Sequence, residues 1–222
     1  MATHTEWEAL NSEAVSLYHQ GFYDRAVEVA KKALQVAGQV LDLDHPAMAT
    51  SLTTLAGLYK IHDKYALAEP LYKSALAIRE QALGPDHPDV AMSLNNLAGL
   101  YYSQGQYAQA EPLYKRALAI DEKALGPDHP DVATSLDSLA ELYLAQGQYA
   151  QAEPLYKRAL AITEKAFGPD YPNVVMILEN IAGLYRKTGR DKEAEPLEQR
   201  AAAILATATP LSSKGNTLNL CE

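Results

Sequence analysis

The chain has 222 residues, of which 48% are hydrophobic, and a formal net charge of -9. The hydrophobic content is enough for a sizeable core. The negative charge argues against a surface for nucleic acid or for anionic membrane, because such surfaces need clustered Lys and Arg. No leader-like segment precedes Trp7, no apolar run reaches about eighteen residues, and the one cysteine, Cys221, excludes an intrachain disulfide. We therefore expect a cytoplasmic protein in a reducing compartment.

The sequence repeats with a period of 42 residues. Asp-His-Pro occurs at 44–46, 86–88 and 128–130, and Asp-Tyr-Pro follows at 170–172. Glu-Pro pairs and segments of the form Leu-Ala-Gly-Leu-Tyr keep the same spacing, and a weaker copy lies upstream. We expect a disordered tail at 208–222, preceded by five units at about 5–44, 45–86, 87–128, 129–170 and 171–207.

Apolar residues within each unit have helical spacing. In the third unit Leu94, Leu97, Ala98 and Tyr101 share one face of a predicted first helix, which Gly105 ends. Because a single helix pair would leave one face uncovered, neighbouring units are expected to stack.

A second helix is predicted after that glycine, with its apolar face running from Tyr107 to Leu118. It ends at Gly126-Pro127, and Pro130 opens the next helix, where a missing N–H costs nothing. Pro112 lies more than a turn inside the second helix, so we expect a slight bend there in each unit.

The pattern Leu94…Leu97-Ala98…Tyr101…Gly105…Tyr107…Ala110…Tyr114…Ala117 resembles the tetratricopeptide repeat (TPR). The 42-residue period resembles the longer repeats of kinesin light chains and of many bacterial repeat proteins. This resemblance, over about residues 5–207, implies an all-α fold: a right-handed α-solenoid of about five antiparallel helix pairs. It also implies a scaffold or adaptor whose first helices line a concave groove that holds a peptide or partner segment. No segment resembles the coiled coil that joins kinesin light chains to a motor, so motor function is not expected.

The third and fourth units differ at eight of 42 positions, and six of these lie in the first helix. The six positions fall within an arc of roughly 120° at about 100° per residue. Outer positions such as Gln109, Lys115 and Arg116 are unchanged in the fourth unit. Taking the outer surface as equally unconstrained, we interpret the divergent face as the ligand surface.

The predicted groove residues occupy the equivalent positions of units two to five. They are Thr50, Thr53, Thr54, Gly57, Lys60, Met92, Asn95, Asn96, Gly99, Tyr102, Ser103, Thr134, Asp137, Ser138, Glu141, Leu144, Met176, Glu179, Asn180, Gly183, Arg186 and Lys187. Asn amides can pair with a ligand backbone, and Tyr102 offers an aromatic anchor with a polar tip. The predicted groove residues carry both acidic and basic side chains. A groove for strongly acidic peptides, as in the kinesin light chains, would need more Lys and Arg.

Other chemistries have little support in the sequence. His45, His87 and His129 recur in equivalent loops, too far apart to share a metal ion, and their repetition indicates duplication and helix capping. The tyrosines at 59, 101, 143 and 185 are interpreted as core residues rather than a stacking platform. No phosphate-binding Gly loop, Cys–His pair or zinc-spaced His-Glu cluster occurs, so we expect neither catalysis nor a cofactor.

Two classes of function remain open. In the first, the chain is an adaptor that binds a protein or peptide partner in its groove. In the second, the terminal helix packs on another copy, and the chain is a self-associating structural or regulatory module without a dedicated ligand. We expect a monomer or a weak homo-oligomer, with no nucleic acid or membrane partner.

Overall fold

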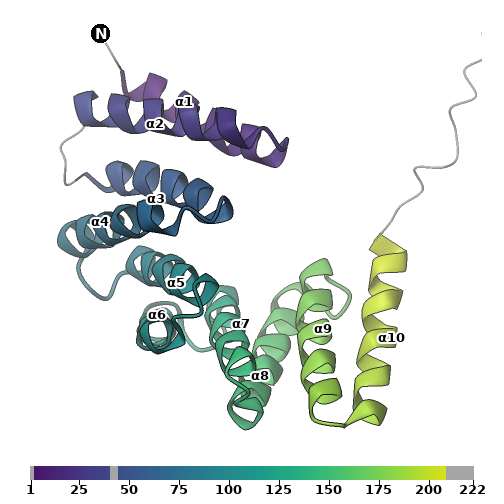
Figure 1. Ribbon diagram of the computed structural model, residues 1–222. Helices are drawn as coiled ribbons and strands as arrows, with labels where there is room; N and C mark the ends of the chain where they lie inside the picture. Colours follow the sequence, from purple (N-terminus) through teal and green to yellow (C-terminus); the bar gives the residue numbers. More distant parts are fainter. Residues whose placement is uncertain (1–2, 41–44, 209–222) are drawn as a thin grey trace, which may run out of the picture.

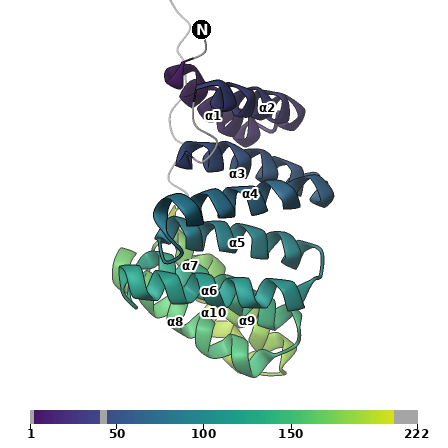
Figure 2. The same cartoon turned by 90° about the vertical axis from the view of Figure 1, so that its left-hand side faces the viewer.

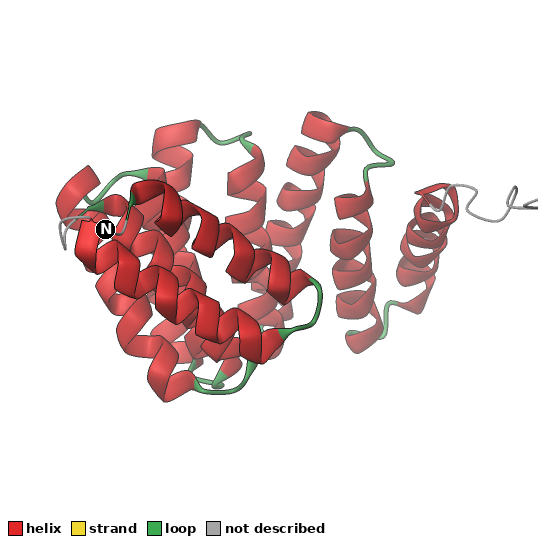
Figure 3. Cartoon of the chain, turned by 90° about the horizontal axis from the view of Figure 1, so that it is seen from above, coloured by secondary structure: helices red, strands yellow, loops and turns green. Residues whose placement is uncertain are grey.

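The computed structural model describes residues 3–40 and 45–208, which fold into ten α-helices and no strand (Figures 1 and 3). The helices are α1 (His4–His19), α2 (Tyr23–Val40), α3 (Pro46–Ile61), α4 (Tyr65–Leu83), α5 (Pro88–Ser103), α6 (Tyr107–Leu125), α7 (Pro130–Ala145), α8 (Tyr149–Phe167), α9 (Pro172–Lys187) and α10 (Asp191–Ala208). They pack as five antiparallel pairs, which confirms the predicted all-α array. Residue 208 closes α10, and the rest of the predicted tail, with Cys221, lies outside the described residues.

The first helix of most units begins at a histidine cap. The Nδ1 atoms of His45, His87 and His129 accept hydrogen bonds from backbone N–H groups two residues later, at 3.1, 3.1 and 3.2 Å. The following proline occupies the first turn of the helix. Because these caps satisfy donors that have no intrahelical partner, the repeated histidines have a structural role, as predicted.

Positive backbone φ angles mark the turns. Gly105, Gly147 and Gly189 have φ near +70° at the turn between the helices of a pair, and Asp63 takes this place in unit two with φ 55°. Gly126 ends the second helix with φ 90° and ψ 155°, a conformation that is essentially restricted to glycine. The second helices run on through Pro70, Pro112, Pro154 and Pro196, and the bend expected there stays a prediction.

Small and aromatic side chains form the core. Ala98 and Ala110 are fully buried where the two helices of unit three cross, and their equivalents in units two and four are equally buried. Tyr101, Tyr143 and Tyr185 are at most 6% exposed, which confirms these three tyrosines as core residues, whereas Tyr59 is partly buried and packs against the core. Each such large apolar side chain contributes roughly 1.5–3 kcal/mol, much of it across the boundary between units.

The array is curved. Each first helix contacts the first helix of the next unit, whereas the described residues show no such contact between successive second helices. Figure 1 accordingly shows α3, α5 and α9 on the inner side of the arch, and Figure 2 shows α3 to α6 stacked in order. We call the inner side, formed by α1, α3, α5, α7 and α9, the concave surface.

The glutamates of the first three Glu-Pro pairs each join two units. Tyr101, Tyr143 and Tyr185 donate hydroxyl hydrogen bonds to Glu69, Glu111 and Glu153 of the preceding unit, at 3.0, 3.3 and 3.1 Å. A lysine four residues after each glutamate forms an ion pair with the same carboxylate. This Glu–Tyr contact explains why the glutamate and the tyrosine recur with the same period.

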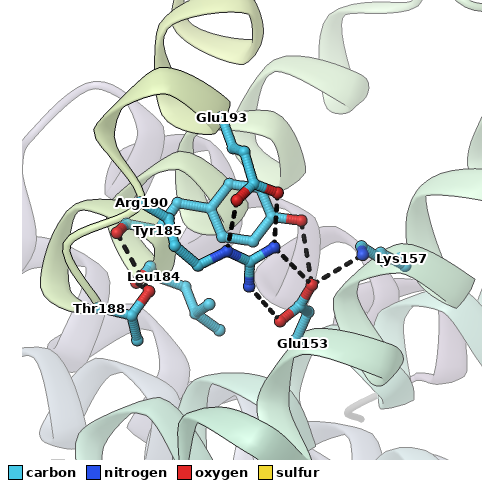
Figure 4. Close-up of polar contacts among 7 residues, drawn as sticks. All are labelled: Glu153, Lys157, Leu184, Tyr185, Thr188, Arg190 and Glu193. Carbon is cyan, nitrogen blue, oxygen red and sulfur yellow. Dashed lines mark hydrogen bonds and ion pairs between the residues drawn. The ribbon is translucent and has the colours of Figure 1, made fainter.

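The last junction is reinforced by Arg190 (Figure 4). Its guanidinium donates to Glu153 and Glu193, and its Cζ atom lies 3.9 Å from the centroid of the Tyr185 ring. Hydrogen bonds from Arg190, Lys157 and Tyr185 lower the pKa of Glu153 to about 2. The carboxylate is therefore held in its charged form by partners from both units.

No helix in the described part of the chain has the length and apolar character needed to cross a membrane.

Candidate partner-binding groove

The predicted groove residues lie on the first helices α3, α5, α7 and α9. All of them are exposed or partly exposed except Asp137, whose exposed fraction is 9%. The concave surface thus carries a row of accessible Thr, Asn, Met and Tyr side chains. That these residues bind a partner stays a prediction.

Some of these side chains also hold neighbouring units together. The Asn95 amide donates to Ser135 Oγ at 2.8 Å, and Ser135 donates to Asp121 at 2.7 Å. At the first junction Trp7 and Asn11 donate to Ser51, which occupies the same place as Ser135. The serines were missed in the sequence because they interrupt an otherwise apolar face, and that polar interruption was the available signal.

These contacts account for part of the divergence between units three and four. The junction after unit three combines Asn95, Asp121 and Ser135, whereas the next junction has Asp137, Thr163 and Ile177 at the equivalent positions. Because Ile177 has no hydroxyl, it can neither accept from an amide nor donate to a carboxylate. The replacement of Asn95 by Asp137 and of Asp121 by Thr163 thus accompanies the loss of the serine that links the units.

The outer surface is not the unconstrained reference that the comparison assumed. Arg116 forms an ion pair with Glu80 at 2.7 Å and donates to the Pro85 carbonyl, so it binds the preceding unit and connector. Arg158 repeats this arrangement with Glu122 and Pro127. Lys115 pairs with Glu111, the partner of Tyr143. The premise is therefore wrong for Lys115, Arg116 and Arg158, whose side chains are held by contacts between units.

Hollows lie between consecutive first helices. One of about 290 Å³ separates α1 from α3, and others of about 310 Å³ and 250 Å³ separate α5 from α7 and α7 from α9. Their lining includes the predicted residues Thr54, Met92, Asn96, Thr134 and Met176.

The hollow between α1 and α3 adds residues that the sequence prediction left out. Val15 and Tyr18 of α1 line it together with Ile61 of α3, and Val15 and Ile61 are 44% and 49% exposed. The comparison of units three and four could not find them, because unit one has diverged. Exposed apolar residues on a predicted first helix were the remaining signal.

At the carboxyl end of the array the basic groove charges are partly neutralised. Arg186 bonds both oxygens of Glu198, at 3.0 and 2.7 Å, and pairs with Asp191 at 3.1 Å. These bonds raise the pKa of the Arg186 guanidinium. Lys187 is exposed beside it. Arg186 is therefore a poor candidate for capturing an acidic ligand.

No group of three or more His, Cys, Asp or Glu side chains in the described ranges is arranged to hold a metal ion.

The sequence matches the family model described as Tetratricopeptide repeat at residues 8–81, 62–123, 94–165 and 138–207. These matches span most of the chain, and the chain belongs to the tetratricopeptide repeat family.

Two solved structures with a similar fold show which kind of repeat protein the chain resembles. A Podosopora anserina protein of nearly identical TPR-like repeats, named as a kinesin light chain, is 26% identical, with a TM-score of 0.76 over 95% of this chain and 100% of that chain. BtubC (BKLC) from P. vanneervenii is 24% identical, with a TM-score of 0.78 over 98% of this chain and 88% of its own. The structural neighbours are thus kinesin light chain-like repeat proteins. The sequence has no match among curated proteins.

Proposed function

We propose that this TPR protein is a scaffold that holds a peptide, or an extended segment of a partner protein, against its concave surface. The TPR fold is in general a protein–protein interaction module. The observation that supports the finer proposal is the set of hollows between consecutive first helices, each bordered by accessible polar or apolar side chains.

Such a surface suits an extended ligand for a physical reason. Successive hollows can each receive one side chain, while Asn96, Asn180 and Tyr102 can bond the ligand backbone. Because much of the concave surface is formed by rigid helices packed on both sides, little ordering of the protein is needed on binding.

The test is a peptide array probed with the wild-type protein and with Asn96→Ala and Tyr102→Ala variants. We expect both variants to lose roughly tenfold or more in affinity for the peptides that wild type selects, because each loses a central contact. Asn95 is left intact, since its removal would also unpair Ser135. Gln109→Ala on the exposed outer face is the matched control and should bind like wild type.

Binding that survives both groove changes would remove the concave surface from the proposal. Light scattering tests the alternative directly. A stable dimer whose interface includes Glu193 to Leu205 of α10 would favour a self-associating structural module instead.

A further inference from the structure

The centre of the concave surface contains a partly buried ammonium group. Lys60 of α3 reaches over α5, where its Nζ atom lies 3.2 Å from the position that a Cβ atom on Gly99 would take. Burial lowers the pKa of Lys60, whereas the charge of Glu141 on α7 raises it. Within the described residues Lys60 forms no ion pair shorter than 4 Å, so its attraction to Glu141 acts at longer range.

Two carboxylates lie near this ammonium group on α7, and the charge of one of them, Glu141, acts on Lys60. Asp137 and Glu141 lie one turn apart on α7, and neither forms an ion pair with a Lys or Arg of the described chain. The polar contact of Asp137 is a long hydrogen bond of 3.4 Å from the Asn180 amide of α9. Burial and the charge of Glu141 raise the pKa of Asp137 to about 6, and burial also raises that of Glu141. The centre therefore has more buried negative than positive charge.

A tyrosine hydroxyl at the same place has no partner. Tyr156 of α8 is fully buried, and its hydroxyl has no hydrogen-bond partner in the structure. The equivalent hydroxyls of Tyr72 and Tyr114 lie 3.5 Å from the positions that Cβ atoms on Gly57 and Gly99 would take.

Glu141 occupies the place of those glycines in unit four. The charges of Asp137 and Glu141 act on Tyr156 and raise its pKa further than burial alone. Because Glu141 takes the place of those glycines, the Tyr156 hydroxyl lies beside the Glu141 side chain and bonds neither carboxylate, which is a costly arrangement for a buried polar group.

We propose that this polar centre, formed by Asp137, Glu141 and Tyr156, binds a basic side chain of the partner segment, preferably arginine. The inference rests on the proposed scaffold function and names the chemistry of its ligand. A guanidinium has five N–H donors, enough to bond both carboxylates and the Tyr156 oxygen together, and it would balance the excess negative charge. Lysine could also neutralise the carboxylates, but its compact ammonium group has only three N–H donors and lacks the rigid planar geometry of the guanidinium. An acidic side chain would meet two carboxylates of its own sign.

The test uses pools of peptides about nine residues long, with randomised flanks and a central Arg, Lys, citrulline or Glu. Binding to the full-length protein is measured by fluorescence polarisation. We expect the Arg pool to bind roughly tenfold or more tightly than the citrulline pool, which keeps the shape but lacks the charge. The Glu pool should bind more weakly than either.

The same pools are then applied to variants. Asp137→Asn/Glu141→Gly gives unit four the residues that unit three has at these positions, so the repeat already accommodates them. It should bind the Arg and citrulline pools equally. Glu141→Gln alone is the second variant and should reduce the preference. Glu195→Gln removes one exposed charge from α10, which lines none of the three hollows, and should keep the preference.

The outcomes separate the two proposals. If the wild-type protein binds peptides without favouring Arg, or if the preference survives in both centre variants, the basic-ligand inference is overturned while the scaffold function stands. If no pool binds and the array also selects no peptide, the scaffold function falls and the inference falls with it.

Discussion

At the residue scale, this protein repeats one set of contacts and changes it at a few positions. Asp137 is the clearest change, because the equivalent Asn95 is neutral and bonded to the next unit. Placing a carboxylate in this buried site costs free energy, since Asp137 has a weak amide contact and no cation beside it. Residues that reduce stability in this way are often retained for binding.

Replacing Asp137 by Asn should therefore stabilise the protein. The pKa of Asp137 rises from 3.8 to about 6 in the folded state, so the folded state holds a proton between these values that the unfolded state has lost. Stability from this group falls as the pH rises through that window. We expect Asp137→Asn to add about 1–3 kcal/mol to the free energy of unfolding at pH 7.5 and to flatten this pH dependence. Urea denaturation at several pH values measures both; an unchanged pH profile would contradict the assignment.

Glu153 should show the opposite sign. Its pKa is lowered to about 2 by Arg190, Lys157 and Tyr185, so its contribution is complete above about pH 4.5 and is lost as the pH falls towards 2. Glu153→Gln should cost about 1–3 kcal/mol at neutral pH. Glu111→Gln is the matched control and should cost less, because no arginine bonds Glu111. Equal losses in thermal denaturation would show that Arg190 adds nothing to this junction.

At the scale of the element, the ends of the helices depend on special backbone geometry. Gly126 ends α6 with φ 90° and ψ 155°, a backbone conformation that alanine adopts only with strain. Gly126→Ala should therefore destabilise the protein by about 1–3 kcal/mol, although no neighbouring residue would contact the new methyl group within 4 Å. Gly183 lies inside α9 with equally open surroundings. Gly183→Ala should instead stabilise by about 0.5–1 kcal/mol, because alanine favours the helix. Chemical denaturation of the two variants gives opposite signs if backbone conformation is the cause.

The element scale also explains how much of the fold was predictable. Apolar spacing, glycine stops and proline starts are local signals, so the helices and their pairing followed from the sequence of one unit. The groove was less predictable, since Asn95 and Ser135 are 40 residues apart and their hydrogen bond exists only after two units stack. The same holds for Arg116, whose partner lies in the preceding unit.

At the scale of the whole molecule, stability is distributed along the array as a chain of junctions. The first junction lacks a Glu–Tyr contact, because Val27 stands where later units have the glutamate. It relies on Ser51, which accepts hydrogen bonds from Trp7 and Asn11. The last junction has both the Glu–Tyr contact and the Arg190 clamp.

Hydrogen exchange should reflect the difference in strength between the first and the last junction. We expect amides of α1 and α2 to exchange faster than those of α9 and α10, and both terminal pairs to exchange faster than α5 to α8, which have neighbours on both sides. Glu153→Gln should accelerate exchange in α9 and α10 while leaving α1 and α2 unchanged. A uniform exchange rate along the array would instead indicate that all five units unfold as one.

The sequence by itself determined the architecture, because most helix ends and core positions of units two to five are marked by local signals that repeat with a period of 42 residues. Only the tertiary structure decided which side chains face one another across units. It showed that outer residues repeated between units three and four hold the stack together. It also showed that Glu141 of α7 lies near Lys60 of α3 and Tyr156 of α8 at the centre of the concave surface. The physical reason is that the interacting residues are far apart in the sequence. Periodicity indicates which face of a helix is buried. The charge balance and the unsatisfied hydrogen-bonding groups depend on residues that come together only when the units stack.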